Sequence, residues 1–340
     1  MTSLPPPAPI REVAQIDRAT FDNDIRPAGL PVVLRGLADA WPATRSARAG
    51  DDAFADYCLA FGAAQRVPIV LAQPEVGGRF FYGDDLTSLN FARREVDLAF
   101  FFDRLIRHEK VSPQPNAVAL QSTLISGLLP GFVEENPMPL LDTTVEPRIW
   151  IGNRVRVAPH YDLAENIGVV VSGRRRFTVF PPDQIGNLYT GPLEMTPAGT
   201  PISLVDLAAP DLDRFPRFAE AAKAAQSAVL EPGDAIYLPF AWWHGVDSLD
   251  PVSTLVNYWW SQAPTSLPPP YAALTLSIAA LRSLPVDHRR AWKILYDHYI
   301  FAESDVAAAH LPDAAQGILG PPRPAVIQRL YATLMQIFAR

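Results

Sequence analysis

Hydrophobic residues recur with two different periods along the chain, and the period changes twice. In the first third of the chain, helical and strand-like spacings alternate. Helical spacing predicts helices at residues 12–21, 51–61 and 96–107, and short apolar runs predict strands at 31–36 and 66–72. We therefore expect an N-terminal α/β region.

After about residue 117 the pattern changes to short apolar runs that are rich in β-branched and aromatic residues. Glycine, proline and aspartate separate these runs, which read RIWIGNRVRVAPH, ENIGVVVSG, RRFTVFPP, SAVLEPGDAIYLP and STLVNYWW. Many short strands at close spacing are typical of a β-sandwich or a barrel. One helical insert, at residues 216–226, interrupts the series. The middle of the chain is thus expected to be a β core.

From residue 271 the helical period returns, in segments 271–284, 287–302 and 323–339. One amphipathic tail helix could pack on its own β core. Three successive helices carry more apolar surface than one edge of a sandwich covers, and exposed apolar patches usually mark interfaces. We therefore expect a two-fold homodimer whose interface includes residues 292–299 or 330–337.

These patterns predict three regions and a mainly β fold with flanking helices (α+β). Residues 1–115 form an N-terminal α/β region that packs on the core, and residues 116–265 form the β domain. Residues 266–340 form a C-terminal helical region that mediates dimerisation.

Composition and charge exclude several classes of protein. Of the 340 residues, 49% are hydrophobic and 19% are charged, which fits a folded globular protein. A net charge of −7 argues against nucleic acid as a partner. Apolar runs such as 167–171 are far shorter than the roughly 20 residues that cross a membrane. The N-terminus lacks the pattern of a secretory signal, and the single Cys58 cannot form an internal disulfide, so we expect a cytoplasmic protein.

The chemistry-bearing residues include a His-x-Asp pair at the end of a predicted strand. A two-residue spacing places His160 and Asp162 on one face. His244 follows another predicted strand and is flanked by Trp242 and Trp243. Taken singly, His244 could be a core histidine and His160 a turn residue. Together, two imidazoles and one carboxylate form the facial triad that leaves coordination positions open on Fe(II).

An arginine lies in the core phase of the strand that follows Gly173. Strand alternation puts Arg175 on the same face as the apolar Phe177. A buried unpaired cation costs several kcal/mol, so Arg175 needs an anionic partner. That partner is either a protein carboxylate or the carboxylate of a cosubstrate. Asn166 and Asn257, on predicted core strands, add polar groups that an apolar sandwich does not need.

Two long segments, HYDLAENIGVVVSGRRRFTVFPPDQIGNLYTGP and PGDAIYLPFAWWHGVDSL, resemble the Jumonji-C or cupin-like oxygenase family. Within that family, the asparaginyl hydroxylase that modifies the hypoxia-inducible transcription factor is similar. The resemblance covers roughly residues 30–265. It implies a double-stranded β-helix (jelly roll) in the β domain. It also implies use of Fe(II), O₂ and 2-oxoglutarate, with decarboxylation to succinate coupled to hydroxylation of a C–H bond.

The resemblance implies roles for the residues singled out above. His160, Asp162 and His244 match the catalytic iron ligands, and Asn166 and Asn257 match asparagines near the cosubstrate. Arg175 stands where a lysine of the asparaginyl hydroxylase binds the distal carboxylate of 2-oxoglutarate. Relatives dimerise through C-terminal helices, which agrees with the homodimer expected here.

The sequence also departs from that hydroxylase. Val157 and Ala119 stand where it has a threonine and a tyrosine, so two hydroxyl donors are missing. The segment TPAGTPIS lacks its polar substrate-contacting pair, so its protein substrate is not inherited.

Three functions follow. The first is an Fe(II)/2-oxoglutarate-dependent hydroxylase acting on a protein side chain or a small molecule. The second is a metal-binding cupin whose altered pocket holds another acid or supports other chemistry. The third is a non-catalytic interaction or regulatory protein, which the intact ligand set disfavours.

Overall fold

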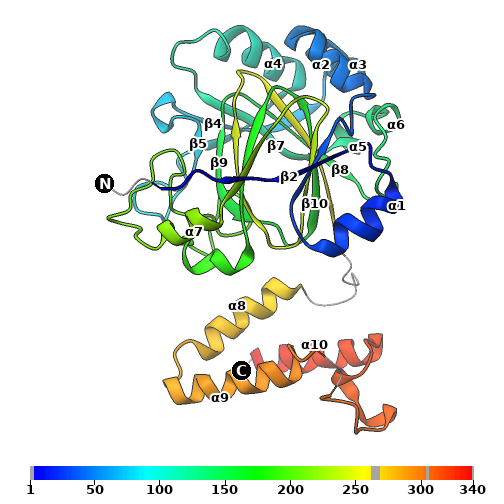
Figure 1. Cartoon of the computed structure of the whole chain (residues 1–340), viewed down its shortest axis with the longest axis vertical. Coiled ribbons are helices and arrows are strands. Elements are labelled where there is room, and N and C mark those ends of the chain that lie inside the picture. The colour runs from blue at the N-terminus through cyan, green and yellow to red at the C-terminus, as the bar shows by residue number, and fades with distance from the viewer. Residues whose placement is uncertain (1–3, 262–268, 304–305, 339–340) are drawn as a thin grey trace. The chain divides into compact units, whose positions relative to one another are not determined.

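A computed structural model of the chain describes residues 4–261, 269–303 and 306–338 (Figure 1). The chain divides into two compact units, Met1–Ser261 and Gln262–Arg340. The region boundaries expected from the sequence, at 115/116 and 265/266, stay predictions.

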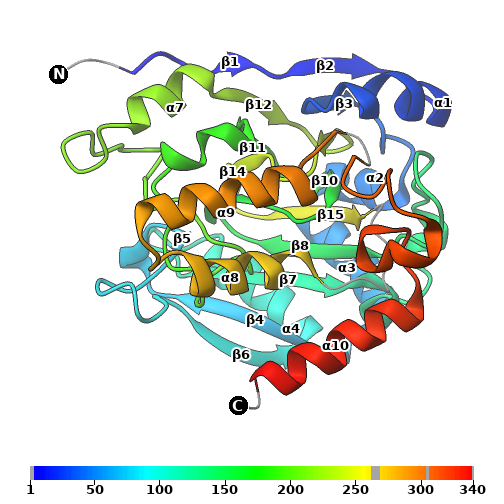
Figure 2. The same ribbon diagram turned by 90° about the horizontal axis from the view of Figure 1, so that it is seen from below.

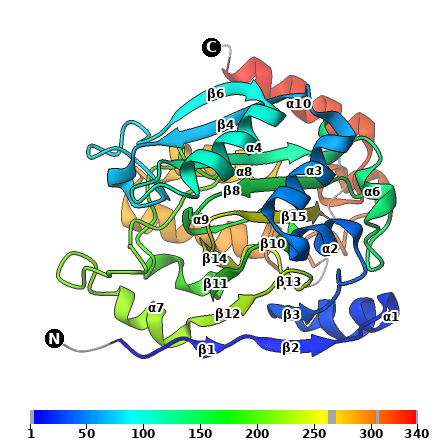
Figure 3. The same ribbon diagram turned by 90° about the horizontal axis from the view of Figure 1, so that it is seen from above.

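The first unit is built on two sheets whose strands pair mainly in the antiparallel sense. The six-stranded sheet runs β1 (Ala8–Pro9), β12 (Gln226–Leu230), β11 (Arg175–Phe180), β14 (Trp243–Ser248), β9 (Arg156–Tyr161) and β5 (Arg79–Phe80). The nine-stranded sheet runs β2 (Arg11–Ala14), β3 (Val32–Arg35), β13 (Ala235–Leu238), β10 (Glu165–Ser172), β15 (Ser253–Trp260), β8 (Pro147–Gly152), β7 (Ala117–Leu124), β4 (Arg66–Ala72) and β6 (Ala92–Asp97). Figure 3 shows this succession from β6 to β2, and Figure 2 shows β12, β11 and β14 of the smaller sheet.

The inner faces of the two sheets pack against each other. Phe177 and Val179 of the smaller sheet share an apolar cluster with Val170, Ile236 and Leu255 of the larger one. Alternation along each strand supplies these inward residues and sends their neighbours outward. The two packed sheets and their flanking helices confirm the predicted α+β class with a jelly-roll core.

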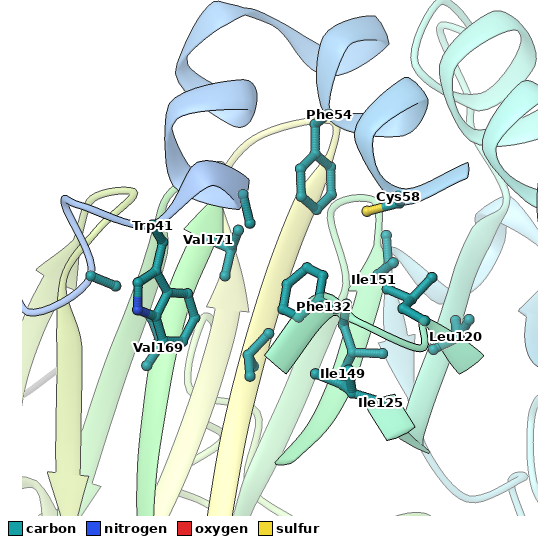
Figure 4. Close-up of a cluster of buried hydrophobic side chains, with 14 of the residues drawn as sticks. Trp41, Phe54, Cys58, Leu120, Ile125, Phe132, Ile149, Ile151, Val169 and Val171 are labelled. Carbon is teal, nitrogen blue, oxygen red and sulfur yellow. The ribbon is translucent and has the colours of Figure 1, made fainter. Parts of the chain in front are cut away.

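Helices cover the outer faces of both sheets. In the first unit they are α1 (Arg18–Thr20), α2 (Pro42–Ala49), α3 (Asp51–Gly62), α4 (Leu98–Asp103), α5 (Ile125–Leu128), α6 (Phe132–Glu135) and α7 (Phe218–Ala224). Phe54 and Cys58 of α3 pack with Ile149 and Ile151 of β8 in the largest apolar cluster (Figure 4). Cys58 is fully buried there, and burial raises the pKa of its thiol, so it packs as a small apolar side chain. On the smaller sheet, Phe218 of α7 belongs to a separate cluster.

Two of the expected elements differ from the structure. The first residues of the helix expected at 12–21 belong instead to strand β2, and helical structure begins only at Arg18, with α1 and the π-helical turn Phe21–Ile25 that follows it. Strand β2 pairs in parallel with β3, and Arg35 binds Glu12 across the pair at 2.6 Å. This pairing between distant segments overrides the local helical pattern. The helix expected at 96–107 begins only at Leu98, because β6 runs to Asp97.

The register between strands β9 and β14 determines how the two candidate histidines lie relative to each other. His160 and His244 are directly opposite each other in this antiparallel pair. A bulge follows, between His244 and Val246, so that Val246 lies opposite Val157. Residues directly opposite each other in a sheet point to the same face. The two imidazoles therefore lie on one face of the smaller sheet.

The second unit contains helices α8 (Pro270–Leu281), α9 (Val286–Tyr299) and α10 (Pro324–Phe338). Ser277 of α8 and Tyr296 of α9 share a hydrogen bond of 2.8 Å. Trp292, Leu295 and Ile337 are 42%, 43% and 58% exposed. Among the described residues, none of the helices has both the length and the apolar character needed to cross a bilayer.

Candidate metal centre

The three predicted metal ligands lie together between the two sheets. His160 is on β9, Asp162 directly follows that strand, and His244 is near the start of β14. One ligand atom from each residue lies within 4.8 Å of the other two. Nε2 of His244 is 3.6 Å from Oδ2 of Asp162, and the two imidazole centroids are 4.3 Å apart. This spacing suits a single ion bound by all three residues.

Backbone carbonyls orient both imidazoles. Nδ1 of His160 lies 3.1 Å from the carbonyl oxygen of Ala158, and Nδ1 of His244 lies 3.1 Å from that of Trp242. In this arrangement each Nδ1–H donates to a carbonyl and each Nε2 keeps its lone pair. Burial, and then the neighbouring His244, lowers the pKa of His160 to about 4. His160 is thus neutral at neutral pH, which is the form that binds a metal.

Two hydrogen bonds fix the carboxylate. Nδ2 of Asn166 donates to Oδ2 of Asp162 at 2.9 Å, and Nε1 of Trp259 donates to the same oxygen at 3.0 Å. Groups that hold a ligand in this way set its orientation and its basicity. Asn166 and Trp259 therefore position Asp162.

A further step in this hydrogen-bond chain involves Asn257. Its Nδ2 donates to Oδ1 of Asn166 at 3.4 Å, and its Oδ1 accepts from Nε1 of Trp150 at 2.7 Å. The structure thus places both predicted asparagines behind Asp162. Trp150 and Trp259 were missed by the sequence reasoning. The alternation of β15, which puts Trp259 on the face of Asn257, is the signal that could have indicated one of them.

Trp259→Phe tests the support of the carboxylate, since it keeps an aromatic ring at this position and removes the N–H donor. We expect metal affinity to fall by about 10- to 100-fold, the usual cost of losing such a contact. Calorimetric titration with Mn(II) measures this. Trp41→Phe is the matched control, because the Trp41 indole donates to the carbonyl of Pro137, outside the site. Equal affinities of the two variants would contradict a positioning role for Trp259.

A cavity of about 560 Å³ opens beside the three ligands. Val157, Phe177, Val246 and Leu255 form apolar parts of its wall. Arg175 also lines the cavity, displaced along the strands from the ligands. In the pair of β11 and β14, Val179 lies opposite His244 and Arg175 lies opposite Ser248. The backbone of Arg175 is therefore four residues, or about 13 Å, further along the strands than the position of His244. The cavity therefore offers a metal site and a cation at some distance from each other.

Arg175 is buried, as its strand phase predicts, with only 5% of its surface exposed. Its Nε donates to Oγ of Ser253 at 2.8 Å, and Nη2 donates to the Ser253 carbonyl at 3.4 Å. Within the described part of the chain, no carboxylate forms an ion pair with it. Burial lowers the pKa of Arg175 to about 9, so the guanidinium stays protonated at neutral pH. The alternative that a protein carboxylate neutralises Arg175 therefore does not hold for the described residues.

A glycine turn sets the start of β11 and hence the position of Arg175. Gly173 has a φ of +63°, a backbone angle that residues with a side chain rarely adopt. A Cβ there would lie 2.3 Å from the carbonyl oxygen of Val252. Only glycine fits this close approach, two residues before Arg175.

The two positions that lack hydroxyls lie in apolar surroundings. Val157 lines the cavity. Ala119 is buried in a small apolar cluster with Val70 and Phe80. Residues 197–199, from the TPAGTPIS segment, also line the cavity and contribute no charged side chain.

Comparison with known proteins agrees with this geometry. A family model described as "Cupin-like domain" matches residues 18–266. Lysine-specific demethylase 8 of Xenopus tropicalis is 27% identical over 239 residues, which are 68% of this chain and 48% of that protein. The Danio rerio protein of the same name is 26% identical over 264 residues, 74% of this chain and 59% of that protein. HSPB1-associated protein 1 of Homo sapiens is 37% identical over 118 residues, 34% of this chain and 23% of that protein.

The chain thus spans less than two thirds of the length of each of these relatives. The narrower resemblance to an asparaginyl hydroxylase stays a prediction.

Proposed function

Because the chain belongs to the cupin-like domain family, we propose that it is an Fe(II)- and 2-oxoglutarate-dependent oxygenase that hydroxylates a protein side chain or a small molecule. One observation carries the proposal. A single cavity contains the His160, Asp162 and His244 cluster and a buried Arg175 that has no acidic partner among the described residues.

The donor set fits iron. Two neutral imidazoles and one carboxylate are the ligands of the facial triad that binds non-haem Fe(II) and keeps positions free for other ligands. The Nδ1 atoms of both histidines are engaged by carbonyls, so both Nε2 atoms are available. His160, Asp162 and His244 would hold the ion.

The cavity also fits a dicarboxylic acid. The Arg175 guanidinium has Ser253 as its only hydrogen-bond partner among the described residues, and a carboxylate would supply the missing charge. Phe177 and Leu255 would contact the methylene groups of the acid. We propose that Arg175 binds the distal carboxylate, while Asn166 and Asn257 keep Asp162 in place.

When bound, Fe(II) and 2-oxoglutarate would supply oxidative decarboxylation coupled to hydroxylation. The chain contributes binding and orientation. Arg175 fixes one end of the acid, and the hydrogen-bond chain through Asn166 and Trp259 fixes the carboxylate ligand. The apolar side chains of Val157, Phe177 and Val246 would limit the water around the bound acid.

Anaerobic titration with Fe(II) and 2-oxoglutarate, followed by a succinate assay in air, tests the proposal. Binding of both and release of succinate are expected. Metal binding without an effect of 2-oxoglutarate would instead indicate a cupin that holds another acid. Binding of neither would indicate a non-catalytic protein. The names of the demethylase relatives make protein side chains the first substrates to assay.

We also propose that the second unit makes the protein a homodimer through residues 292–299 or 330–337. Trp292, Leu295 and Tyr299 of α9 are all more than two-fifths exposed, and association would bury such side chains. Light scattering of the full chain is expected to give the mass of a dimer, and a chain ending near Pro268 that of a monomer. A full chain that is monomeric at about tens of micromolar would contradict this.

A further inference from the structure

We propose that the substrate carries a carboxylate or similar anionic group and that Arg148 binds it. This inference rests on the proposed function, because it concerns the substrate of the same cavity.

Arg148 points into the cavity because of its register. It lies directly opposite Asn257 in the antiparallel pair of β8 and β15. Asn257 faces inward, toward Asn166, and directly opposite residues share a face. Trp150, two residues along β8, also lines the cavity, whereas Ile149 between them belongs to the outer apolar cluster. Arg148 is thus an inward cation on a strand whose outward residues are apolar.

A bulge in the neighbouring strand holds the Arg148 side chain. Between Leu120 and Thr123 the ladder of β7 and β8 shifts, so Gln121 and Ser122 lie opposite Trp150 alone. Ser122 has a φ of +52°, and its carbonyl oxygen accepts a hydrogen bond of 2.7 Å from Nη1 of Arg148. Bulges often occur beside active sites, where they redirect side chains.

Arg148 also lies close to the metal ligands. Its guanidinium carbon is 5.9 Å from the centre of a Trp259 ring, and Nε1 of that indole donates to Asp162. One indole therefore separates Arg148 from the carboxylate ligand. A group bound by Arg148 would hold the rest of a substrate beside the metal centre.

The charges that line the cavity favour an anion. The lining includes Arg93, Arg148 and Arg175, and among the described residues that line the cavity the only carboxylate is that of Asp162. Asp162 accepts from Asn166 and Trp259 and is the proposed metal ligand. If Arg175 binds the cosubstrate, Arg93 and Arg148 remain as the cations that can contact the substrate.

Neither of those two cations is neutralised within the described residues. Arg148 forms no ion pair there, and a guanidinium has five N–H donors, of which the hydrogen bonds to Ser122 engage only those of Nη1. Arg93 lies opposite the cavity-lining Val70 on the exposed strand β6, at the rim. A guanidinium can bind a carboxylate here through two parallel hydrogen bonds, whereas the positive charge of a methylated lysine would be repelled.

The competing interpretation is structural. Arg148 would then only support the β7 bulge through its bond to Ser122. A lysine at this position keeps the charge but loses the planar fork, whereas a glutamine loses the charge. Comparing the two variants separates anion binding from support of the bulge.

The test uses the full chain saturated with Mn(II) and N-oxalylglycine, a non-reacting analogue of 2-oxoglutarate. Three blocked peptides, Ac-Gly-Ala-X-Ala-Gly-NH₂ with X as Asp, Asn or dimethyl-lysine, are titrated by calorimetry. We expect the Asp peptide to bind on the order of tenfold or more tightly than the Asn peptide, as a charged hydrogen bond implies. The dimethyl-lysine peptide should bind no better than the Asn peptide. N-acetylaspartate methylamide, titrated in parallel, shows whether a free acid suffices or flanking residues are needed.

The variants decide the role of Arg148. Arg148→Gln should lose the preference for Asp over Asn, and Arg148→Lys should keep part of it. Arg154→Gln is the matched control, because Arg154 is exposed and outside this cavity, and it should keep the full preference.

Three outcomes would overturn the inference. The first is that the natural chain does not bind the Asp peptide or does not prefer it. The second is a preference for the dimethyl-lysine peptide. The third is that both Arg148 variants lose the preference equally and have a lowered thermal midpoint. Failure of Mn(II) or N-oxalylglycine to bind, with the Asp preference intact, would refute the proposed function and leave the anion site standing.

Discussion

Replacing His160 and Asp162 together with alanine is expected to abolish stoichiometric metal binding. The double variant removes two of the three ligand atoms that lie within 4.8 Å of one another, and His244 alone does not hold a divalent ion firmly. Metal analysis after anaerobic loading with Fe(II) and gel filtration should fall from about one ion per chain to background. Full occupancy of the double variant would refute the assignment of the site.

The control for this experiment is a second His–Asp pair. His108 and Asp103 are exposed on the surface, with Nε2 and Oδ2 3.8 Å apart. His108→Ala with Asp103→Ala removes the same chemical groups and should leave metal content unchanged. Asp162→Asn separates folding from binding, because it keeps the side-chain shape near Asn166 and Trp259 while removing the charge.

Arg175→Met is expected to weaken 2-oxoglutarate binding strongly and leave the metal in place. Losing one partner of a buried, charge-assisted pair costs about 2–5 kcal/mol, much of it from the stranded anion. That range corresponds to a loss of affinity between about thirtyfold and several thousandfold. Titration of the Fe(II)-loaded protein with 2-oxoglutarate under nitrogen measures it.

The neighbouring arginine on the same strand supplies the matched control. The Arg176 side chain is 49% exposed and lies 3.9 Å from the carboxylate of Asp247, on the opposite face. Arg176→Met should therefore bind 2-oxoglutarate normally. If Arg175→Met unfolds at lower temperature but binds the acid as the natural chain does, Arg175 is structural.

Elements with strong local patterns were predictable from the sequence. Strand β4 spans the residues expected from RVPIVLA, and α3 spans the helix expected at 51–61 with one further residue at its end. The inward direction of Arg175 followed from alternation along β11, since the period of a strand is two residues. Each of these conclusions needs only neighbouring residues.

Features that depend on the pairing of distant segments were not predictable in this way. Strand β2 exists because β3 offers it a partner. The order of the hydrogen-bond chain from Trp150 through Asn257 and Asn166 to Asp162 depends on the registers of β8, β15 and β10. The direction of Arg148 depends on the same registers and on a bulge with a left-handed Ser122, a conformation that its residue type does not indicate.

If the proposed site holds iron, the register of β9 and β14 would also link iron supply to the lifetime of the protein. His160 and His244 meet only when these two strands are paired as they are here, because a slip of one residue turns a side chain to the other face. An ion that binds only the folded chain shifts the folding equilibrium by about 2.7 kcal/mol at a hundred times its dissociation constant. Chains made without iron would unfold more often and meet proteases more often. A shortage of iron would then lower the amount of the protein as well as its turnover.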